Sequence, residues 1–246
     1  MQTFYFTDPG KVRSHNEDSV TIQNKNNKEF VLAIADGMGG HKAGEVASKI
    51  AIDHIINSFS KINTIGTKEN AINWLRNTVS EINEQIFEYA HTHEESKGLG
   101  TTLVVAIKTE DYILYGNIGD SSGFVIKNGI LHKATKDHTY VNMLLNSGKI
   151  SEEAARNHPG KNLLTRALGA NDPIEIDIFD IDTSIKGIFL CSDGLTNMLS
   201  TEQIEKTINS NLSIEEVVIK LIKKANSRGG TDNISIAYLK KESGEN

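Results

Sequence analysis

Six acidic residues of this sequence share one kind of position, where an apolar run meets a polar or glycine-rich segment. They are Glu17, Asp18, Asp36, Asp120, Asp193 and Asp232. If these positions converge in the fold, the carboxylates repel one another and raise one another's pKa unless cations neutralise them. Hard oxygen donors select Mg²⁺ or Mn²⁺ over zinc, so the pattern predicts a site for such cations.

The stretch VLAIADGMGGH, residues 31–41, is the centre of this pattern. Its apolar run predicts a buried strand that delivers Asp36 to its tip, followed by a loop with almost no side chains. Such a loop suits a cation or a close-lying phosphate. An isolated Asp-Gly pair is more typical of a simple turn, so this stretch alone leaves both interpretations open.

Composition narrows the class of protein. The chain has 246 residues, 38% of them hydrophobic, and a formal net charge of −6. The negative charge disfavours a nucleic-acid or anionic-membrane partner. The single cysteine, Cys191, excludes an intramolecular disulfide. Neither a signal pattern nor an apolar run near the ~20 residues of a membrane span is present. We therefore expect a cytoplasmic protein, a monomer without nucleic-acid or membrane partners.

The order of elements predicts an α+β fold of antiparallel sheets with helices on their outer faces. Four closely spaced segments, 100–109, 112–120, 122–127 and 130–135, predict one antiparallel meander, because their connections are too short for parallel crossovers. Further strands are expected at 3–7, 19–23, 29–35, 174–181, 187–191 and 233–239, and helices at 43–59, 72–89, 201–208 and 213–225. Residues 137–169, with two short helices, form a polar excursion that resembles a flap. We expect one domain over residues 1–240 and a disordered tail at 241–246.

The motifs RSHNED, ADGMGGH, GTT, IGDS, DHT, TRALG, CSDGL and TDNIS follow one another from Arg13 to Asn233. In this order they resemble the PP2C (PPM) family of metal-dependent protein serine/threonine phosphatases, in its bacterial form. The resemblance implies a four-layer α/β/β/α sandwich with two central antiparallel sheets. It also implies hydrolysis of phosphoserine and phosphothreonine in proteins by a hydroxide that bridges two Mg²⁺ or Mn²⁺ ions, without a phosphoenzyme.

The resemblance assigns roles to individual residues. Asp36 would bridge the two metals, and the carbonyl of Gly37 would ligate the second. Asp193 and Asp232 would complete the first. Glu17 would hold metal-bound waters, and Asp18 would act from the adjacent shell. Asp120 would bind a possible third metal together with Asp193. Arg13 would be the phosphate-binding arginine. Asn233 matches a supporting position beside a metal ligand, and His138 matches a position that would support the flap from beneath. Arg166 would either support the flap or form a second contact to the substrate.

The sequence departs from the family pattern in two places. Met38 stands where many eukaryotic members carry a His thought to be the general acid, and Met38 cannot donate a proton. His41 is a weak candidate for that role. Ser122 stands where an Arg usually follows the IGDS segment, and we expect a structural effect without loss of catalysis.

The implied partners are phosphorylated proteins and a cognate bacterial Ser/Thr kinase. Two alternatives stay open. A non-catalytic phosphatase-like binding module should have lost ligands, and none of the expected carboxylates is missing. A metal phosphoesterase acting on small molecules is the other alternative, whereas the acidic composition counts against nucleic acid.

Overall fold

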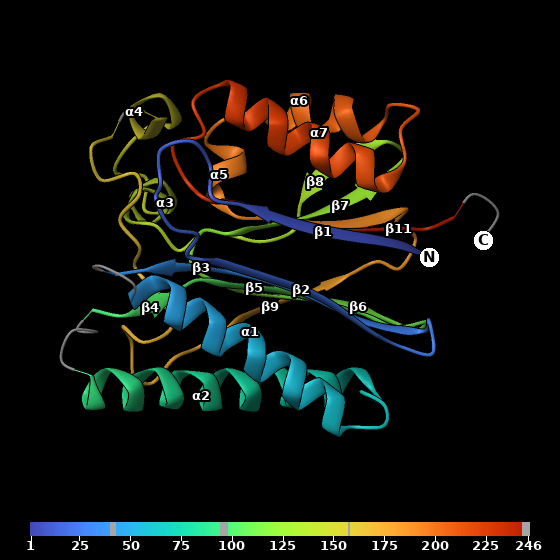
Figure 1. Ribbon diagram of the computed structural model, residues 1–246, viewed down its shortest axis with the longest axis horizontal. Helices are drawn as coiled ribbons and strands as arrows, with labels where there is room; N and C mark the ends of the chain where they lie inside the picture. Colours follow the sequence, from blue (N-terminus) through green and yellow to red (C-terminus); the bar gives the residue numbers. More distant parts are fainter. Residues whose placement is uncertain (40–42, 94–97, 157, 243–246) are drawn as a thin grey trace.

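Two antiparallel sheets stacked face to face form the centre of the computed structural model (Figure 1), which describes residues 1–39, 43–93, 98–156 and 158–242. One sheet has the strand order β1-β11-β10-β7-β8, and the other β2-β3-β5-β6-β9 with β4 paired to β3. His41 and the end of the predicted tail, residues 243–246, lie outside the described residues.

The strands are β1 Gln2–Asp8, β2 Asp18–Lys25, β3 Glu29–Met38, β4 Gly100–Thr101, β5 Leu103–Lys108, β6 Ile113–Ile118, β7 Ser122–Lys127, β8 Ile130–Lys133, β9 Asp177–Ile181, β10 Gly187–Cys191 and β11 Ile234–Lys240. The helices are α1 Ala43–Lys61, α2 Lys68–Thr92, α3 Tyr140–Asn146, α4 Glu152–Arg156, α5 Asp193–Thr196, α6 Thr201–Ile208 and α7 Ile214–Ser227.

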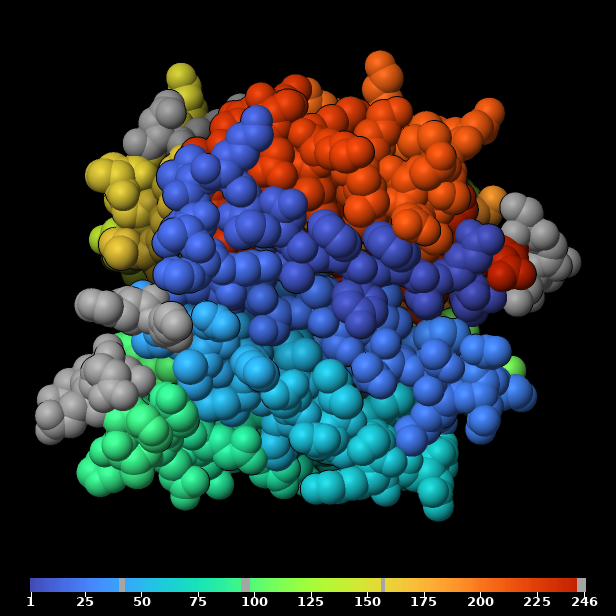
Figure 2. Space-filling model, in the orientation of Figure 1, coloured from blue at the N-terminus to red at the C-terminus, as the bar shows by residue number. Residues whose placement is uncertain are grey.

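Each sheet is covered on its outer face by helices (Figure 1). The apolar stripes of α1 and α2 pack on the β2–β9 sheet, where Ile55, Leu75 and Ile82 are fully buried. The helices α5–α7 cover the other sheet with Leu195, Val218 and Leu221. Figure 2 shows β1 as a dark-blue band at the surface between the two helical layers.

A third apolar cluster fills the space between the sheets. It includes Leu32 and Ile34 of β3, Val104 of β5, and Ile188 and Leu190 of β10. Because β3 is buried on both faces, its sequence is continuously apolar rather than alternating. The predicted α+β sandwich of antiparallel sheets between helices is confirmed.

The predicted single meander is wrong. β5 and β6 pair in one sheet, whereas β7 and β8 belong to the other. The chain changes sheet at residues 119–121, where Gly119 has a φ of +94° that L side chains rarely adopt. Sequence spacing could not distinguish a tight hairpin from this tight crossing.

Many element boundaries differ from the expectation by a few residues, and three differences concern the surroundings of the site. The strand predicted over 100–109 is divided into β4 and β5, because Thr102 donates its N–H to the carbonyl of Asp36 instead of continuing one ladder. β9 begins at Asp177 rather than at Ile174. The short helix α5, which begins at Asp193, was not predicted.

None of the helices in the described part of the chain combines the length and the apolar character needed to cross a bilayer.

Candidate active site

A cavity of about 530 Å³ lies at one end of the sandwich, where separate segments of the chain meet. Its polar lining comes from the loop before β2, the end of β3, the β6–β7 crossing, the segment after the flap helices, α5 and the loop before β11. The charged lining residues are Arg13, Glu17, Asp36, Asp120, Arg166, Asp193 and Asp232, and Gly37 and Met38 lie beside them. The convergence expected from the sequence is therefore present.

The end of β3 is held rigidly around Asp36. Its backbone N–H donates to Thr102 Oγ1 (3.0 Å), and its carbonyl accepts from Thr101 Oγ1 (2.9 Å) and from the Thr102 N–H (2.9 Å). Gly37 follows, and a Cβ there would lie 2.0 Å from the carbonyl oxygen of Gly44 in α1. Only glycine permits this close approach of helix and strand.

Asp18 pairs directly with Asp36 across the β2–β3 ladder and is buried. Its Oδ2 accepts from Ser192 Oγ at 2.8 Å, whereas its buried Oδ1 has no hydrogen-bond partner. Asn233 fixes the loop that precedes Asp18. The Oδ1 of Asn233 accepts the N–H of Glu17 (2.8 Å), and its Nδ2 donates to the carbonyl of His15 (2.9 Å).

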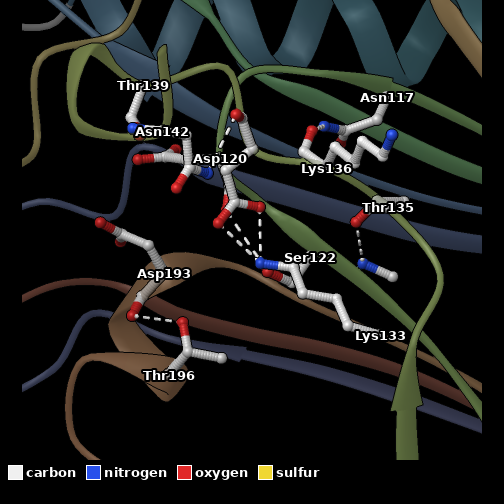
Figure 3. A network of polar contacts seen from close by, with 12 residues as sticks. Asn117, Asp120, Ser122, Lys133, Thr135, Lys136, Thr139, Asn142, Asp193 and Thr196 are labelled. Carbon is white, nitrogen blue, oxygen red and sulfur yellow. Dashed lines mark hydrogen bonds and ion pairs between the residues drawn. The ribbon is translucent and has the colours of Figure 1, made fainter. Parts of the chain in front are cut away.

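Asp193 and Asp120 face a common space on the flap side of the cavity. Both also line a second hollow of about 500 Å³ beneath α3 and α4. Figure 3 shows both residues near Lys133 and Asn142, with Thr196 Oγ1 donating to the main-chain carbonyl of Asp193 at 3.3 Å. Lys133 forms an ion pair with Asp137 at 2.6 Å, and Asn197 Nδ2 donates to Asp193 Oδ2 at 3.0 Å.

Crowding perturbs the ionisation of these acids. Burial, reinforced by the charges of Asp18, Asp193 and Asp120, raises the pKa of Asp36 well above its ordinary value. Burial raises the pKa of Asp18 to about 7, and the charges of Asp193 and Asp232 act in the same direction. Burial together with the Asp193 charge raises the pKa of Asp120 to about 7.

The pKa values of two further acids of the cavity are shifted in the same direction. Burial and the charge of Asp232 raise the pKa of Asp193, and burial raises that of Glu17. Burial is the main cause of these shifts and charge repulsion adds to it; a bound cation would oppose both, because it favours the charged form of each carboxyl group.

Arg13 is half-exposed at the mouth of the cavity, and its Nη2 donates to Asp232 Oδ2 at 2.9 Å. This ion pair holds the guanidinium beside the acidic cluster. Arg166 also lines the cavity and donates to Asp177 Oδ1 at 2.6 Å. His138 Nε2 contacts the other oxygen of the same carboxylate, Asp177 Oδ2, at 3.1 Å.

The residues of the cavity fit divalent cations in their chemistry. The donors are carboxylate oxygens, the set that Mg²⁺ and Mn²⁺ prefer. The orphaned Oδ1 of buried Asp18 is a further acceptor without a protein partner. No group of three or more His, Cys, Asp and Glu side chains within the described ranges is already arranged around a common ion position.

Three neighbours of the site had no predicted role. Thr102 holds Asp36, Ser121 contacts Thr102 Oγ1 through its own Oγ at 2.8 Å, and Ser192 holds Asp18. They lie inside the motifs GTT, IGDS and CSDGL, so the motifs were the available signal. Their hydrogen bonds join segments far apart in sequence, and spacing alone does not reveal such pairings.

A larger groove, of about 760 Å³, runs between α1 and α2 away from this cluster. Its histidine, His54, is bonded at both ring nitrogens, to Glu81 at 2.8 Å and to Gln85 at 2.9 Å. Since neither nitrogen is left for a substrate, we assign the chemistry to the smaller acidic cavity.

Comparisons with known proteins agree with the fold. A family model described as protein phosphatase 2C matches residues 11–233. The serine/threonine phosphatase stp of Listeria monocytogenes is 40% identical over 244 residues, 98% of this chain and 96% of that protein. The protein phosphatase PhpP of Streptococcus pneumoniae is 34% identical, with 97% of each chain covered.

Solved structures give the same result. The serine/threonine phosphatase Stp1 from Staphylococcus aureus superposes with a TM-score of 0.92 at 34% identity, covering 98% of this chain and 95% of that one. The phosphatase PstP/Ppp of Mycobacterium tuberculosis gives 0.83 at 31% identity, covering 98% and 99%. The chain belongs to the protein phosphatase 2C family. Within it, this protein is a bacterial-type serine/threonine protein phosphatase.

Proposed function

We propose that this phosphatase hydrolyses phosphoserine and phosphothreonine in proteins with two divalent cations, Mn²⁺ or Mg²⁺, and without a phosphoenzyme. The observation that carries the proposal is the convergence of the six predicted acidic residues, five of them in the lining of one cavity that also contains Arg13. Asp18, the sixth, is paired with Asp36 behind it.

Each acidic residue would have its own role in binding the cations. Asp36 would contact both, the carbonyl of Gly37 the second, and Asp193 and Asp232 the first. Glu17 and Asp18 would act from the surrounding shell, and Asp120 with Asp193 at a third site. When bound, the cations supply a nucleophilic water of lowered pKa and positive charge opposite the phosphoryl oxygens.

Arg13 would bind the phosphoryl group of the substrate. Its guanidinium has a planar fork of donors that matches two phosphate oxygens. At present one nitrogen is bonded to Asp232, and the half-exposed side chain can turn the remaining donors toward the cavity. Met38 lines the same wall and cannot protonate the leaving oxygen, so the proton would come from water or from another residue.

The substrates would be phosphoproteins, and the counterpart would be a bacterial Ser/Thr kinase whose phosphorylation this enzyme reverses. The names of its relatives, serine/threonine phosphatases from several bacteria, support the assignment of phosphoproteins as substrates. The cytoplasmic location and the monomeric state stay predictions from the sequence.

The direct test compares p-nitrophenyl phosphate and a phosphothreonine peptide, each with Mn²⁺ and with EDTA. We expect turnover of both substrates with metal and none with EDTA. Absence of turnover with metal would favour the non-catalytic binding module. Turnover of p-nitrophenyl phosphate alone would favour a small-molecule phosphoesterase.

A further inference from the structure

A bridge of side chains joins the cavity wall to the turn that carries Asp120. At one end, Arg166 Nη1 donates to Asp177 Oδ1 (2.6 Å). At the centre, His138 Nε2 contacts Asp177 Oδ2 (3.1 Å). At the other end, His138 Nδ1 accepts the backbone N–H of Gly119, the residue before Asp120, at 3.1 Å.

The Gly119 end of the bridge is tightly constrained. Its carbonyl accepts the backbone N–H of His138 (2.8 Å) and Asn117 Nδ2 (3.1 Å). Its φ of +94°, and a Cβ position only 2.6 Å from the side chain of Thr102, leave the turn little freedom. Because the backbone and the ring of His138 each form a hydrogen bond with Gly119, the direction in which Asp120 leaves this turn depends on how His138 is held.

The two groups that face residue 177 are both hydrogen-bond donors, so this position requires a carboxylate with two acceptor oxygens. The Gly119 N–H occupies His138 Nδ1, so the ring proton resides on Nε2, and that N–H points at Asp177. Arg166 presents a second donor to the same side chain. A carboxylate accepts from both, whereas an amide would set its own N–H₂ against one of them.

We propose that Asp177 is a positioning residue of the active site: it holds the His138 tautomer that fixes the Gly119–Asp120 turn and keeps Arg166 against the cavity wall. The role of the turn rests on the proposed function, since Asp120 contributes only if hydrolysis takes place in this cavity. Asp177 itself opens β9 and does not line the cavity.

Asp180, three residues along the same strand, provides a matched control. It pairs with Lys68 in an exposed ion pair at 2.5 Å, remote from the cavity lining. Exposed pairs of this kind contribute little to stability. Asp180→Asn therefore makes the same chemical change on the same strand without touching the bridge.

The test measures tautomer and kinetics on the full chain with Mg²⁺. Imidazole ¹⁵N NMR, with the His138 signals identified by comparison with His138→Gln, should show the Nε2–H form in the wild type. In Asp177→Asn a single acceptor oxygen faces two donors, so the ¹⁵N signals of His138 should shift from their wild-type positions, and kcat/KM for a phosphothreonine peptide should fall roughly tenfold or more. Asp180→Asn should leave both unchanged.

An Asp177→Asn variant whose His138 ¹⁵N signals match those of the wild type, or that keeps wild-type kcat/KM, overturns the proposal. Should this variant fail to fold, Asp177→Glu carries the test, because it retains both acceptor oxygens. It should keep the Nε2–H form and most of the activity, and loss of the tautomer without loss of activity contradicts the proposal. A wild type without turnover would refute the proposed function instead, and the tautomer comparison would still distinguish the variants.

Discussion

Replacing Asp18 with Asn tests the electrostatic cost of the acidic cluster in the metal-free protein. Asp18 is only 6% exposed, and its Oδ1 has no partner. Its pKa is about 7 in the folded protein, raised from an ordinary value near 3.8, mainly by burial. Asn keeps the acceptor that Ser192 Oγ uses and removes the charge.

The sign follows from linkage. Because the folded pKa lies above the unfolded one, the folded state binds this proton more tightly. The stability contributed by the group is complete below about pH 4 and is lost as the pH rises through about 7. For an isolated group, the difference between the folded and the unfolded pKa of Asp18 corresponds to roughly 4 kcal/mol of unfolding free energy. Neighbouring carboxylates share the protons, so we expect about 1–4 kcal/mol.

Thermal unfolding followed by circular dichroism in EDTA, from pH 5 to pH 8.5, measures the effect. For a chain of this size each kcal/mol corresponds to about 2–4 °C in Tm. The Tm of Asp18→Asn should exceed that of the wild type by an amount that grows across this range. Asp53→Asn, an exposed change on α1, should have a Tm that changes with pH as the Tm of the wild type does. A difference between Asp18→Asn and wild type that stays constant with pH would refute the reasoning.

Three further predictions concern the surroundings of the site. Arg13→Ala, which removes the partner of Asp232, should raise KM for a phosphopeptide roughly ten- to hundredfold, the equivalent of ~1.5–3 kcal/mol, with a smaller effect on kcat; an unchanged KM would exclude Arg13 from phosphate binding. Gly119→Ala should lower the free energy of unfolding in urea by about 2 kcal/mol or more, because φ is positive there and the new Cβ would clash with the side chain of Thr102. Wild-type stability of this variant would show that the turn does not require glycine. Tyr115→Phe removes a buried hydrogen bond of 2.7 Å to the main chain of β7, so it should cost about 1 kcal/mol or more in the same assay and leave kcat/KM unchanged.

The layers of the fold could be predicted because the sequence encodes them locally. The helix over 201–208 was predicted with the bounds of α6, and the apolar run before Asp36 became the central part of β3. The change of sheet at Gly119 and the division of the 100–109 strand were missed, because both depend on contacts with distant parts of the chain. Periodicity reports which face of a strand is buried and says nothing of the sheet it joins.

The site shows the same limit. Acidic residues at strand ends predicted where charge would converge, because a strand end marks the edge of a sheet. The residues that hold those acids could not be found in this way. Ser192 reaches Asp18 across 174 residues of sequence, and Asp177 reaches His138 across 39. The spacing of residues in the sequence does not predict such hydrogen bonds, and only the atomic positions show which group donates and which accepts.

Turnover of a phosphothreonine peptide by Asp193→Asn at saturating Mn²⁺ tests most directly whether the acidic cavity performs the reaction. The wild type, and Asp180→Asn as a control on an exposed Asp, are measured beside it, with Tm as evidence of folding. The account predicts that Asp193→Asn nearly abolishes turnover in a protein that still folds. Near-normal turnover by this variant would contradict it.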